Sequence, residues 1–443
     1  MRAARRRVAL VAIAAAVLAL LAGCADFPRG SAAELAKKPD QPFASIVRST
    51  DAAEYRGRSV VVSARLRSLR IATGLNGVWV RSDGPDRKVL GFATSYRQPV
   101  TGDSGWTERT AVLDVDPAAQ RIFFGAMNAS GEALWVDDLR LRAADPSEIP
   151  PPSAAARAYL EKAIDIIRRG GYYSDRVDWA RARAGALARA SGAKTTADTY
   201  DAIRYLLGLL GDHHSHFVDP AKARDSREST RRDFEVSGAI VDGIGYVALP
   251  GYNGTNPGRS IAYSSAIAEH VAVAQRDHAC GWIVDLRQDT GGNMYPMLAG
   301  LRPLLGDGPL GYFLNRAGQW IAWTAPKDSS LAHEVPEDFV AVITGHRTGS
   351  AGEAVALSFR GRPNTRTYGD PTAGYSTANQ SFALPDGAVI ALTVGLMADR
   401  HRNIANGALL PDEPTRVPDA VHLADDPAIA AATAWLRAHS CAR

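Results

Sequence analysis

The sequence predicts a multidomain protein with an all-β sandwich over residues 42–142, a helical segment over 154–235 and a layered α/β core over 236–443. Three observations predict this order. Short apolar runs broken by turn residues recur in the first segment at the spacing of about 8–12 residues that is typical of sandwiches. Apolar residues then follow helical spacing, and in the last segment apolar runs alternate with helical stretches, which indicates a layered α/β domain.

Turn residues define the strands of the first domain. Examples of the apolar runs are 59–63 and 77–80, and examples of the turn sequences that interrupt such runs are 82–84 and 102–105. Several prolines within residues 143–153 then predict a stiff linker and a domain boundary.

The helical segment and the core differ in their periodicity. One helix face is predicted by apolar residues at positions 160, 163, 164 and 167, and a second by those at 203, 206, 207 and 210. In the core we expect buried strands within 240–249, 282–286 and 339–344, and helices over 266–276 and 351–359.

The charge balance gives no indication of a nucleic-acid partner. The chain has a formal net charge of +4, and arginines 2, 5, 6 and 7 are the only charged residues before Cys24. Without that segment the net charge is 4 − 4 = 0, so the remainder lacks the basic excess that binds phosphates. We expect neither a cofactor nor a metal.

Residues 1–23 are predicted to be an export signal. The arginines precede an apolar run at 8–21, which is shorter than the roughly 20 residues that a membrane-spanning helix needs. Small residues before Cys24 resemble the bacterial lipobox, which implies cleavage there and a lipid anchor on Cys24. Because Ala25 is not acidic, we expect an outer-membrane anchor facing the periplasm in a Gram-negative host, with residues 24–41 as a tether. The alternative is an ordinary signal peptide with an incidental cysteine.

Cys280 and Cys441 are the two cysteines that follow Cys24. Two alternatives stay open in an oxidising compartment: a disulfide that ties the C-terminus to the core, or two buried free thiols.

A serine stands at a predicted strand-to-helix turn. Residues 348–353 read Thr-Gly-Ser-Ala-Gly-Glu and follow the apolar run at 340–343. The unpaired N–H groups and the dipole of a helix N-terminus favour a negatively charged oxygen, so Ser350 is a candidate nucleophile. The alternative is that Ser350 only caps the helix, with Glu353 completing a capping box.

Three histidines, His213, His214 and His216, lie close together after the second predicted helix. A zinc site would need further ligands in a fixed geometry, whereas a neutral imidazole can accept the proton of a serine hydroxyl near pH 7. A plain polar loop is the third interpretation, and this segment alone does not decide among them.

A third segment combines a buried strand with a double glycine. The chain reads Asp-Leu-Arg at 285–287 and then reaches Gly291 and Gly292. Glycines let the backbone approach a ligand closely and present its N–H groups, although a plain turn also uses them.

The order of these segments resembles the C-terminal-processing and tricorn-core family of serine peptidases. The matching segments are 285–287 with the two glycines, 348–353, Gly-Asp-Pro-Thr-Ala-Gly at 369–374 and Pro-Asp at 411–412. The resemblance covers residues 154–425 and implies a crotonase-like layered core with Ser350 as nucleophile.

This family divides by its general base. One branch uses a lysine downstream of the nucleophile, at a position where this chain has Tyr375. The branch that includes the tricorn core uses a histidine within Asp-x-His-Ser/Thr, and residues 212–215 match it. The resemblance therefore implies His214 as the base, with His346 and His216 as alternatives.

The implied reaction is acyl transfer to Ser350 followed by hydrolysis. His214 would take the hydroxyl proton and return it to the leaving amine. The N–H of Ala351 and that of Gly291 or Gly292 are expected to hold the oxyanion. Glu353 either orients a catalytic group or only caps its helix.

Many members of this family carry a PDZ domain between the histidine and the core. Here only about twenty residues separate Phe217 from Val236, which is too few for such a domain. Substrate capture is therefore expected to come from elsewhere in the chain.

The first domain resembles the galactose-binding-like jelly rolls of carbohydrate-binding modules through Tyr55, Trp106 and the segments 122–125 and 134–138. An exposed tryptophan there would stack on a sugar ring. The alternative is that all its tryptophans, Trp79, Trp106 and Trp135, belong to the core of the sandwich.

The sequence thus predicts a serine-type peptidase of the bacterial cell envelope that acts on peptides or proteins. One alternative is a catalytically silent peptide- or ligand-binding lipoprotein on the same fold. Another is a glycan-binding envelope lipoprotein whose β-domain supplies the function.

Overall fold

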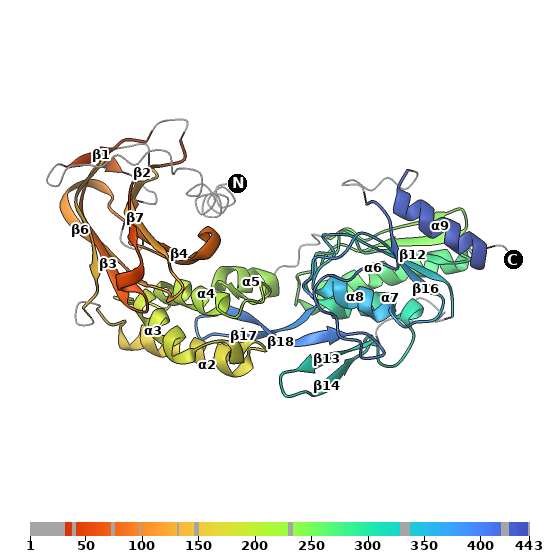
Figure 1. Cartoon of the computed structure of the whole chain (residues 1–443). Coiled ribbons are helices and arrows are strands. Elements are labelled where there is room, and N and C mark those ends of the chain that lie inside the picture. Colours follow the sequence, from red (N-terminus) through yellow and green to blue (C-terminus); the bar gives the residue numbers. More distant parts are fainter. Residues whose placement is uncertain are drawn as a thin grey trace. The chain divides into compact units, whose positions relative to one another are not determined.

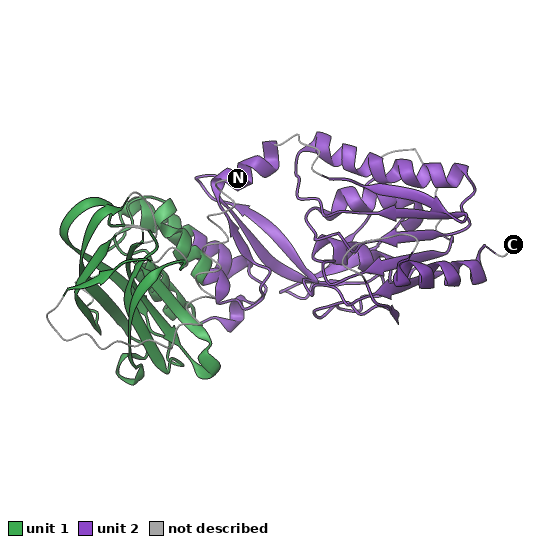
Figure 2. Cartoon of the chain, turned by 90° about the horizontal axis from the view of Figure 1, so that it is seen from above, with its two compact units in different colours: residues 1–162, 178–205 green, residues 163–177, 206–443 purple. Residues whose placement is uncertain are grey.

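The computed structural model describes residues 32–37, 41–71, 76–96, 99–130, 133–145, 150–228, 234–327, 337–417 and 425–441. The predicted export signal and Cys24 lie outside these residues. Two compact units are present, coloured separately in Figure 2. Unit 1 comprises residues 1–162 and 178–205, and unit 2 comprises 163–177 and 206–443. The segment 154–235, expected as a subdomain of its own, is therefore divided between the two units.

Unit 1 contains two four-stranded antiparallel sheets, so the predicted β-rich domain is present, but residues 102–105, expected to be a turn, begin a strand (Figure 1). The first sheet has the order β1 (Ala33–Leu35), β8 (Leu134–Ala143), β3 (Ser59–Ile71) and β6 (Gly102–Asp114). The second has the order β2 (Ala44–Asp51), β7 (Arg121–Asn128), β4 (Asn76–Asp83) and β5 (Val89–Thr94). Alternating residues of both sheets, such as Val60 and Val62 of β3 and Val78 and Val80 of β4, share one buried cluster. The two sheets therefore pack face to face as a sandwich.

Strand β1 corrects the expected tether. Residues 33–35 were predicted to be part of a tether over 24–41, but they pair with β8, where Glu34 lies opposite Trp135. Ala33 and Leu35 are buried and Glu34 is exposed. Three residues are too short a run for the period of a strand to stand out in a sequence.

Three helices follow the sandwich: α2 (Ala154–Gly170), α3 (Trp179–Arg189) and α4 (Tyr200–Gly208). The predicted apolar stripes are their buried faces, since Leu160, Ile164 and Ile167 of α2 are at most 5% exposed. Among the described residues no helix is long and apolar enough to cross a membrane.

Unit 2 is built on a six-stranded sheet whose described strands have the order β10 (Ser237–Val241), β11 (Ile244–Ala248), β12 (Trp282–Asp285), β15 (Val340–Thr344), β16 (Thr365–Gly369) and β19 (Glu413–Pro414). All neighbours from β11 to β19 pair in parallel, while β10 and β11 form an antiparallel hairpin. Strands β12 and β15 are buried along their whole length, which explains why they read as continuous apolar runs.

Helices cover both faces of this sheet (Figure 1). On one face Val284 and Val342 pack with α6 (Pro257–Arg276), α7 (Met294–Leu305) and α8 (Ala351–Phe359). On the other, Ile283 and Ile343 pack with α9 (Pro427–His439). The predicted layered α/β core is therefore present, and the segments at 285–292, 348–353 and 369–374 follow the carboxyl ends of its parallel strands.

A second sheet of unit 2 carries the histidine loop. Its order is β14 (Trp320–Trp323), β13 (Gly311–Asn315), β18 (Val389–Ala398) and β17 (Thr377–Ala383), and β9 (His216–Val218) also pairs with β18. Helix α5 (Pro220–Glu228) follows β9.

A disulfide joins Cys280, just before β12, to Cys441, just after α9. Of the two alternatives left open by the sequence, the structure has the bonded one.

Candidate active site

Ser350 occupies a sharp turn between β15 and α8. Its φ of 54° and ψ of −109° are rarely adopted by a residue with a side chain. Such a conformation costs on the order of 1–3 kcal/mol and persists only where surrounding contacts enforce it. Thr348 provides two of them, since its hydroxyl donates to the carbonyl of Leu286 at 2.8 Å and accepts from the N–H of Gly345 at 3.0 Å.

Glu353 holds the backbone of the nucleophile. Its carboxylate accepts the N–H of Ser350 at 2.9 Å, the N–H of Gly374 at 2.9 Å and the hydroxyl of Thr372. The side chain is fully buried, and burial raises its pKa while these hydrogen bonds oppose the shift. Of the two roles considered for Glu353, the contacts show more than a helix cap, because they tie segment 369–374 to the nucleophile turn.

His214 lies on the loop between α4 and β9 and reaches Ser350 from the second sheet. Its Nε2 is 3.0 Å from the Ser350 Oγ, and its Nδ1 is 2.6 Å from the Thr377 Oγ1. Thr377 is a site residue that sequence reasoning missed: it begins β17 and is 163 positions away from His214. Nothing in its local sequence distinguishes it from any strand threonine.

Hydrogen bonds from three further residues fix the histidine loop. Asp212 accepts the N–H of His214 at 3.1 Å and the N–H of Ser215 at 2.9 Å. The Asn379 side chain donates to the carbonyl of His214 at 3.0 Å, and the N–H of Thr393 donates to the Ser215 hydroxyl at 3.0 Å. Asp212 thus shapes the loop without touching the imidazole.

The imidazole of His214 is held in its neutral form. Burial and, to a smaller extent, nearby His216 lower its pKa to about 4, although Asp212 opposes both. Tyr375 covers part of the ring, with its ring centroid 5.3 Å from that of His214. A neutral imidazole at pH 7 can accept a proton at Nε2 when Nδ1 carries the hydrogen.

The double glycine lies against the nucleophile turn. Gly291 and Gly292 have φ values of 102° and 117°, which disfavour any other residue. A Cβ on Gly291 would lie 2.8 Å from the Ser350 Cβ and 3.2 Å from the Ala351 nitrogen. The approach of these two chain segments therefore requires glycine at 291.

The backbone N–H groups of Gly291 and Gly292 differ in their hydrogen bonding. That of Gly291 donates to the Asp289 carboxyl at 3.0 Å, so it is not available to an oxyanion. Within the described part of the chain, no acceptor is found for the N–H of Gly292 or of Ala351. Of the alternatives predicted for the oxyanion site, the structure contradicts Gly291 and leaves Gly292 with Ala351.

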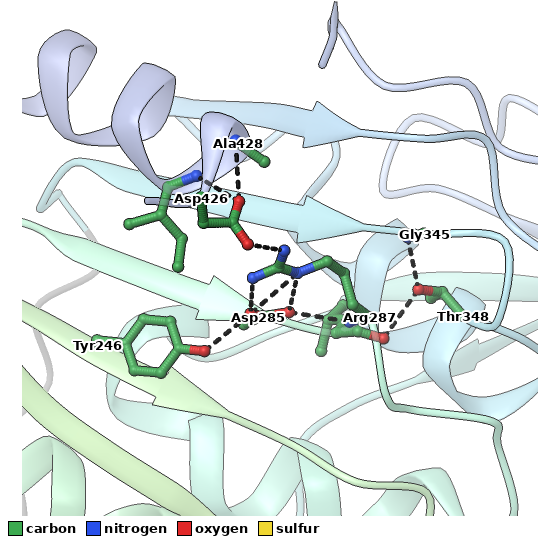
Figure 3. Close-up of polar contacts among 9 residues, drawn as sticks. Tyr246, Asp285, Arg287, Gly345, Thr348, Asp426 and Ala428 are labelled. Carbon is green, nitrogen blue, oxygen red and sulfur yellow. Dashed lines mark hydrogen bonds and ion pairs between the residues drawn. The ribbon is translucent and has the colours of Figure 1, made fainter. Parts of the chain in front are cut away.

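The Asp-Leu-Arg segment at 285–287 forms a buried ion cluster behind the site (Figure 3). Arg287 pairs with both Asp285 and Asp426, and each of the three residues is 2% exposed. Asp426 also caps α9, and the Tyr246 hydroxyl donates to Asp285 at 2.8 Å. This segment therefore fastens α9 to the end of β12 and does not touch Ser350.

The other histidine candidates do not reach the nucleophile. His346 is exposed, and the His216 Nδ1 lies 2.9 Å from the carbonyl of His214. No group of three or more His, Cys, Asp or Glu side chains placed to hold a metal occurs among the described residues. Both ring nitrogens of His214 are engaged by Ser350 and Thr377, which does not fit the zinc interpretation.

Comparison with known families matches residues 243–415 to the model of peptidase family S41. The chain has an S41 peptidase domain. This family consists of serine peptidases, so the protein is a hydrolase that acts on peptides or proteins. The matched region runs from the start of β11 to β19 and contains Ser350 and both glycines.

The chain is similar to curated proteins and to solved structures. The chain is 28% identical over 273 residues to the nisin-resistance protein of Lactococcus lactis subsp. lactis, covering 59% of this chain and 83% of that protein. It is 29% identical over 175 residues to a carboxyl-terminal-processing protease of Synechocystis sp., covering 37% of this chain and 40% of the other. Among solved structures, a lipoprotein from Streptococcus agalactiae matches with a TM-score of 0.56 and 27% identity, over 64% of this chain and 96% of that one.

Proposed function

We propose that this S41 peptidase cleaves peptide bonds through an acyl-enzyme on Ser350, with His214 as general base and Thr377 as the residue that orients it. The observation that carries this proposal is the 3.0 Å contact between the His214 Nε2 and the Ser350 Oγ. That distance is within hydrogen-bond reach, as a nucleophile and its base require.

The proton path follows from the contacts of the imidazole. Nδ1 donates its hydrogen to the Thr377 hydroxyl, which leaves the Nε2 lone pair directed at Ser350. As the Ser350 oxygen bonds to the substrate carbonyl carbon, its proton moves to Nε2. The same proton then passes to the leaving amine as the C–N bond breaks, and water repeats the sequence to release the acyl group.

Two N–H groups are proposed to bind the oxyanion, those of Gly292 and Ala351. Ala351 is the first residue of α8, so its N–H has no intrahelical acceptor and adds to the positive end of the helix dipole. Losing one such donor typically costs about 3–4 kcal/mol of transition-state stabilisation.

A fluorophosphonate probe tests the proposal directly. The wild-type chain should form a covalent adduct at Ser350, and Ser350→Ala should form none. If the folded wild type does not react, the result would favour the alternative hypothesis that the chain is a catalytically silent binding lipoprotein. One relative is named for nisin resistance, which makes nisin the first substrate to try in a cleavage assay.

We further propose that the protein is exported and lipid-anchored through Cys24, in the outer membrane facing the periplasm if the host is Gram-negative. The sequence around Cys24 supports this, and a similar solved structure is named a lipoprotein. The disulfide between Cys280 and Cys441 fits an oxidising compartment. Labelled fatty acid should enter the wild type in the producing bacterium and not Cys24→Ala; equal labelling of both would contradict the anchor.

For the two units we propose the finer fold assignments of a jelly roll and a crotonase-like core. The strand orders β1-β8-β3-β6 and β2-β7-β4-β5 support the first, because eight strands divided over two sheets in this way are typical of jelly rolls. The layered arrangement of α6 to α9 around a mainly parallel sheet supports the second.

One observation favours an additional glycan-binding role for the sandwich. Trp79 is buried, but Trp106 is 37% exposed and Trp135 is only partly buried. Arg65 lies over the ring of Trp106 and Arg67 over that of Trp135, on neighbouring strands of one sheet. Binding of the whole chain to isolated peptidoglycan should weaken in Trp106→Ala; unchanged binding, or none by the wild type, would remove this role.

A further inference from the structure

Asp289 lies between the double glycine and the nucleophile turn and is completely buried. It follows β12 and precedes the glycines by two positions. Its backbone carbonyl accepts the N–H of Gly349 at 3.0 Å, and its carboxyl Oδ1 accepts the N–H of Gly291 at 3.0 Å. One residue thus holds both segments that form the proposed oxyanion site.

The first turn of α8 also packs on Asp289. A Cβ on Gly352 would lie 2.5 Å from the Asp289 carbonyl oxygen and 2.9 Å from its carboxyl carbon. Since Gly349 and Gly352 flank Ser350, any shift of the Asp289 side chain would be passed to the nucleophile turn.

Burial of the Asp289 carboxyl destabilises the folded protein. Its Oδ2 has no hydrogen-bond partner in the described residues, and none of the described ion pairs includes it. An unpaired buried polar atom lowers stability, so a residue with this property next to an active site points to a functional role.

We propose that Asp289 is a positioning residue for the oxyanion site: by binding the N–H of Gly291, it turns the glycine segment so that the N–H of Gly292 joins that of Ala351 beside Ser350. This inference rests on the proposed function. Asp289 touches neither Ser350 nor the substrate and acts through the backbone of the glycines.

The protonation state of Asp289 agrees with this role. Burial raises the pKa of its carboxyl well above the usual value, and the hydrogen bond from Gly291 opposes the shift only in part. Burial thus favours the neutral form of the carboxyl, which does not repel the negative charge that develops on the substrate oxygen.

Three variants test the proposal. Asp289→Asn keeps an oxygen acceptor for Gly291 and is always neutral, whereas Asp289→Leu removes the acceptor at similar size. Gln288→Leu is the control, because that side chain lies on the same loop but is exposed. Each chain, without its export signal, reacts with a fluorophosphonate probe over a range of concentrations, which separates the maximal labelling rate from the half-saturating concentration.

We expect Asp289→Leu to lower the maximal rate by about 10²-fold, with little change in the half-saturating concentration, as when an oxyanion donor is lost. Asp289→Asn should stay within a few-fold of the wild type at pH 7. The Leu variant removes an unpaired buried oxygen but also leaves the buried N–H of Gly291 without an acceptor, so its melting temperature is measured beside its labelling rate.

Two results would overturn the inference: wild-type labelling by Asp289→Leu, or labelling by Asp289→Asn that is as slow as that of the Leu variant. If Asp289→Leu fails to fold, the Asn variant decides through its maximal rate at pH 7, where a loss of about 10²-fold would overturn the inference. An unreactive wild type would instead refute the Ser350 mechanism itself, so the two failures are distinguishable.

Discussion

Ser350 and His214 meet at one point but are held there in different ways. Ser350 belongs to a continuous strand, turn and helix, and Gly345 and Glu353, which help fix this turn, lie within five positions of it. His214 lies on a loop that Asp212 shapes locally and that Thr377, Asn379 and Thr393 hold from a distance, with separations of 163 to 178 residues in these contacts.

This difference teaches that the nucleophile is fixed by its own turn and the buried end of the main sheet, whereas the base depends on hydrogen bonds from another sheet. The ion cluster at that end of the main sheet is buried and does not touch Ser350, so changes in it should act mainly on stability. The histidine loop depends on single hydrogen bonds from β17 and β18, so changes there should act mainly on the proton transfer. Substitutions on each side can separate the two.

The largest effect is expected on the histidine side. His214→Ala should lower the rate of fluorophosphonate labelling by about 10⁴-fold, because Ser350 loses the group that accepts its proton. The labelling rate of His216→Ala should stay within a few-fold of the wild type at pH 7, because the His216 imidazole contacts the backbone carbonyl of His214 and not Ser350. If His214→Ala reacts nearly as fast as the wild type, the base is another group.

On the serine side the largest effect is expected on stability. Arg287→Met should lower the free energy of unfolding by about 3–5 kcal/mol, because Asp285 and Asp426 would be left as unpaired buried charges. Arg437→Met is the matched control: it breaks an ion pair of α9 with Asp242 whose side chains are 54% and 62% exposed, worth at most about 1 kcal/mol. Urea unfolding measures both, and equal losses would show that the cluster is not what fastens α9.

The same difference decides what the sequence could reveal. The helix at 351–359 has the predicted bounds, and the strands within 282–286 and 339–344 agree to within a residue, because their apolar runs and turn residues are local signals. Ser350 and His214 were found through segments with recognisable order. Thr377 and Asp289 were not, because their roles arise from contacts between distant segments. The choice between Gly291 and Gly292 likewise depends on where one N–H points, which no pattern of residues encodes.

Substitution of Thr377 is expected to have an intermediate effect on the labelling rate, and it tests how the imidazole of His214 is oriented. Thr377→Val keeps the shape of the side chain but removes the oxygen near the His214 Nδ1, so it should slow labelling about 10–100-fold without a large change in melting temperature. Thr377→Ser retains the hydroxyl and should recover most of the rate. Equal rates for Val and Ser would mean that the loop anchors alone orient the imidazole.

The smallest effect is expected in the pH profile of labelling, and its direction tests whether the fold sets the base. Because burial and His216 lower the pKa of His214 to about 4, the rate should fall only near pH 4, well below the usual histidine range. His216→Ala removes a charge that disfavours the imidazolium, so the pKa of His214 should rise and the acid limb should move to higher pH.

The lowered pKa of His214 also makes folding stability depend on pH. Between its pKa near 6.5 in the unfolded chain and about 4 in the folded protein, the unfolded chain binds more protons, so stability falls as pH falls through that window. An acid limb near pH 6.5 that does not move in His216→Ala would place the imidazole in open solvent and contradict its burial beside Ser350.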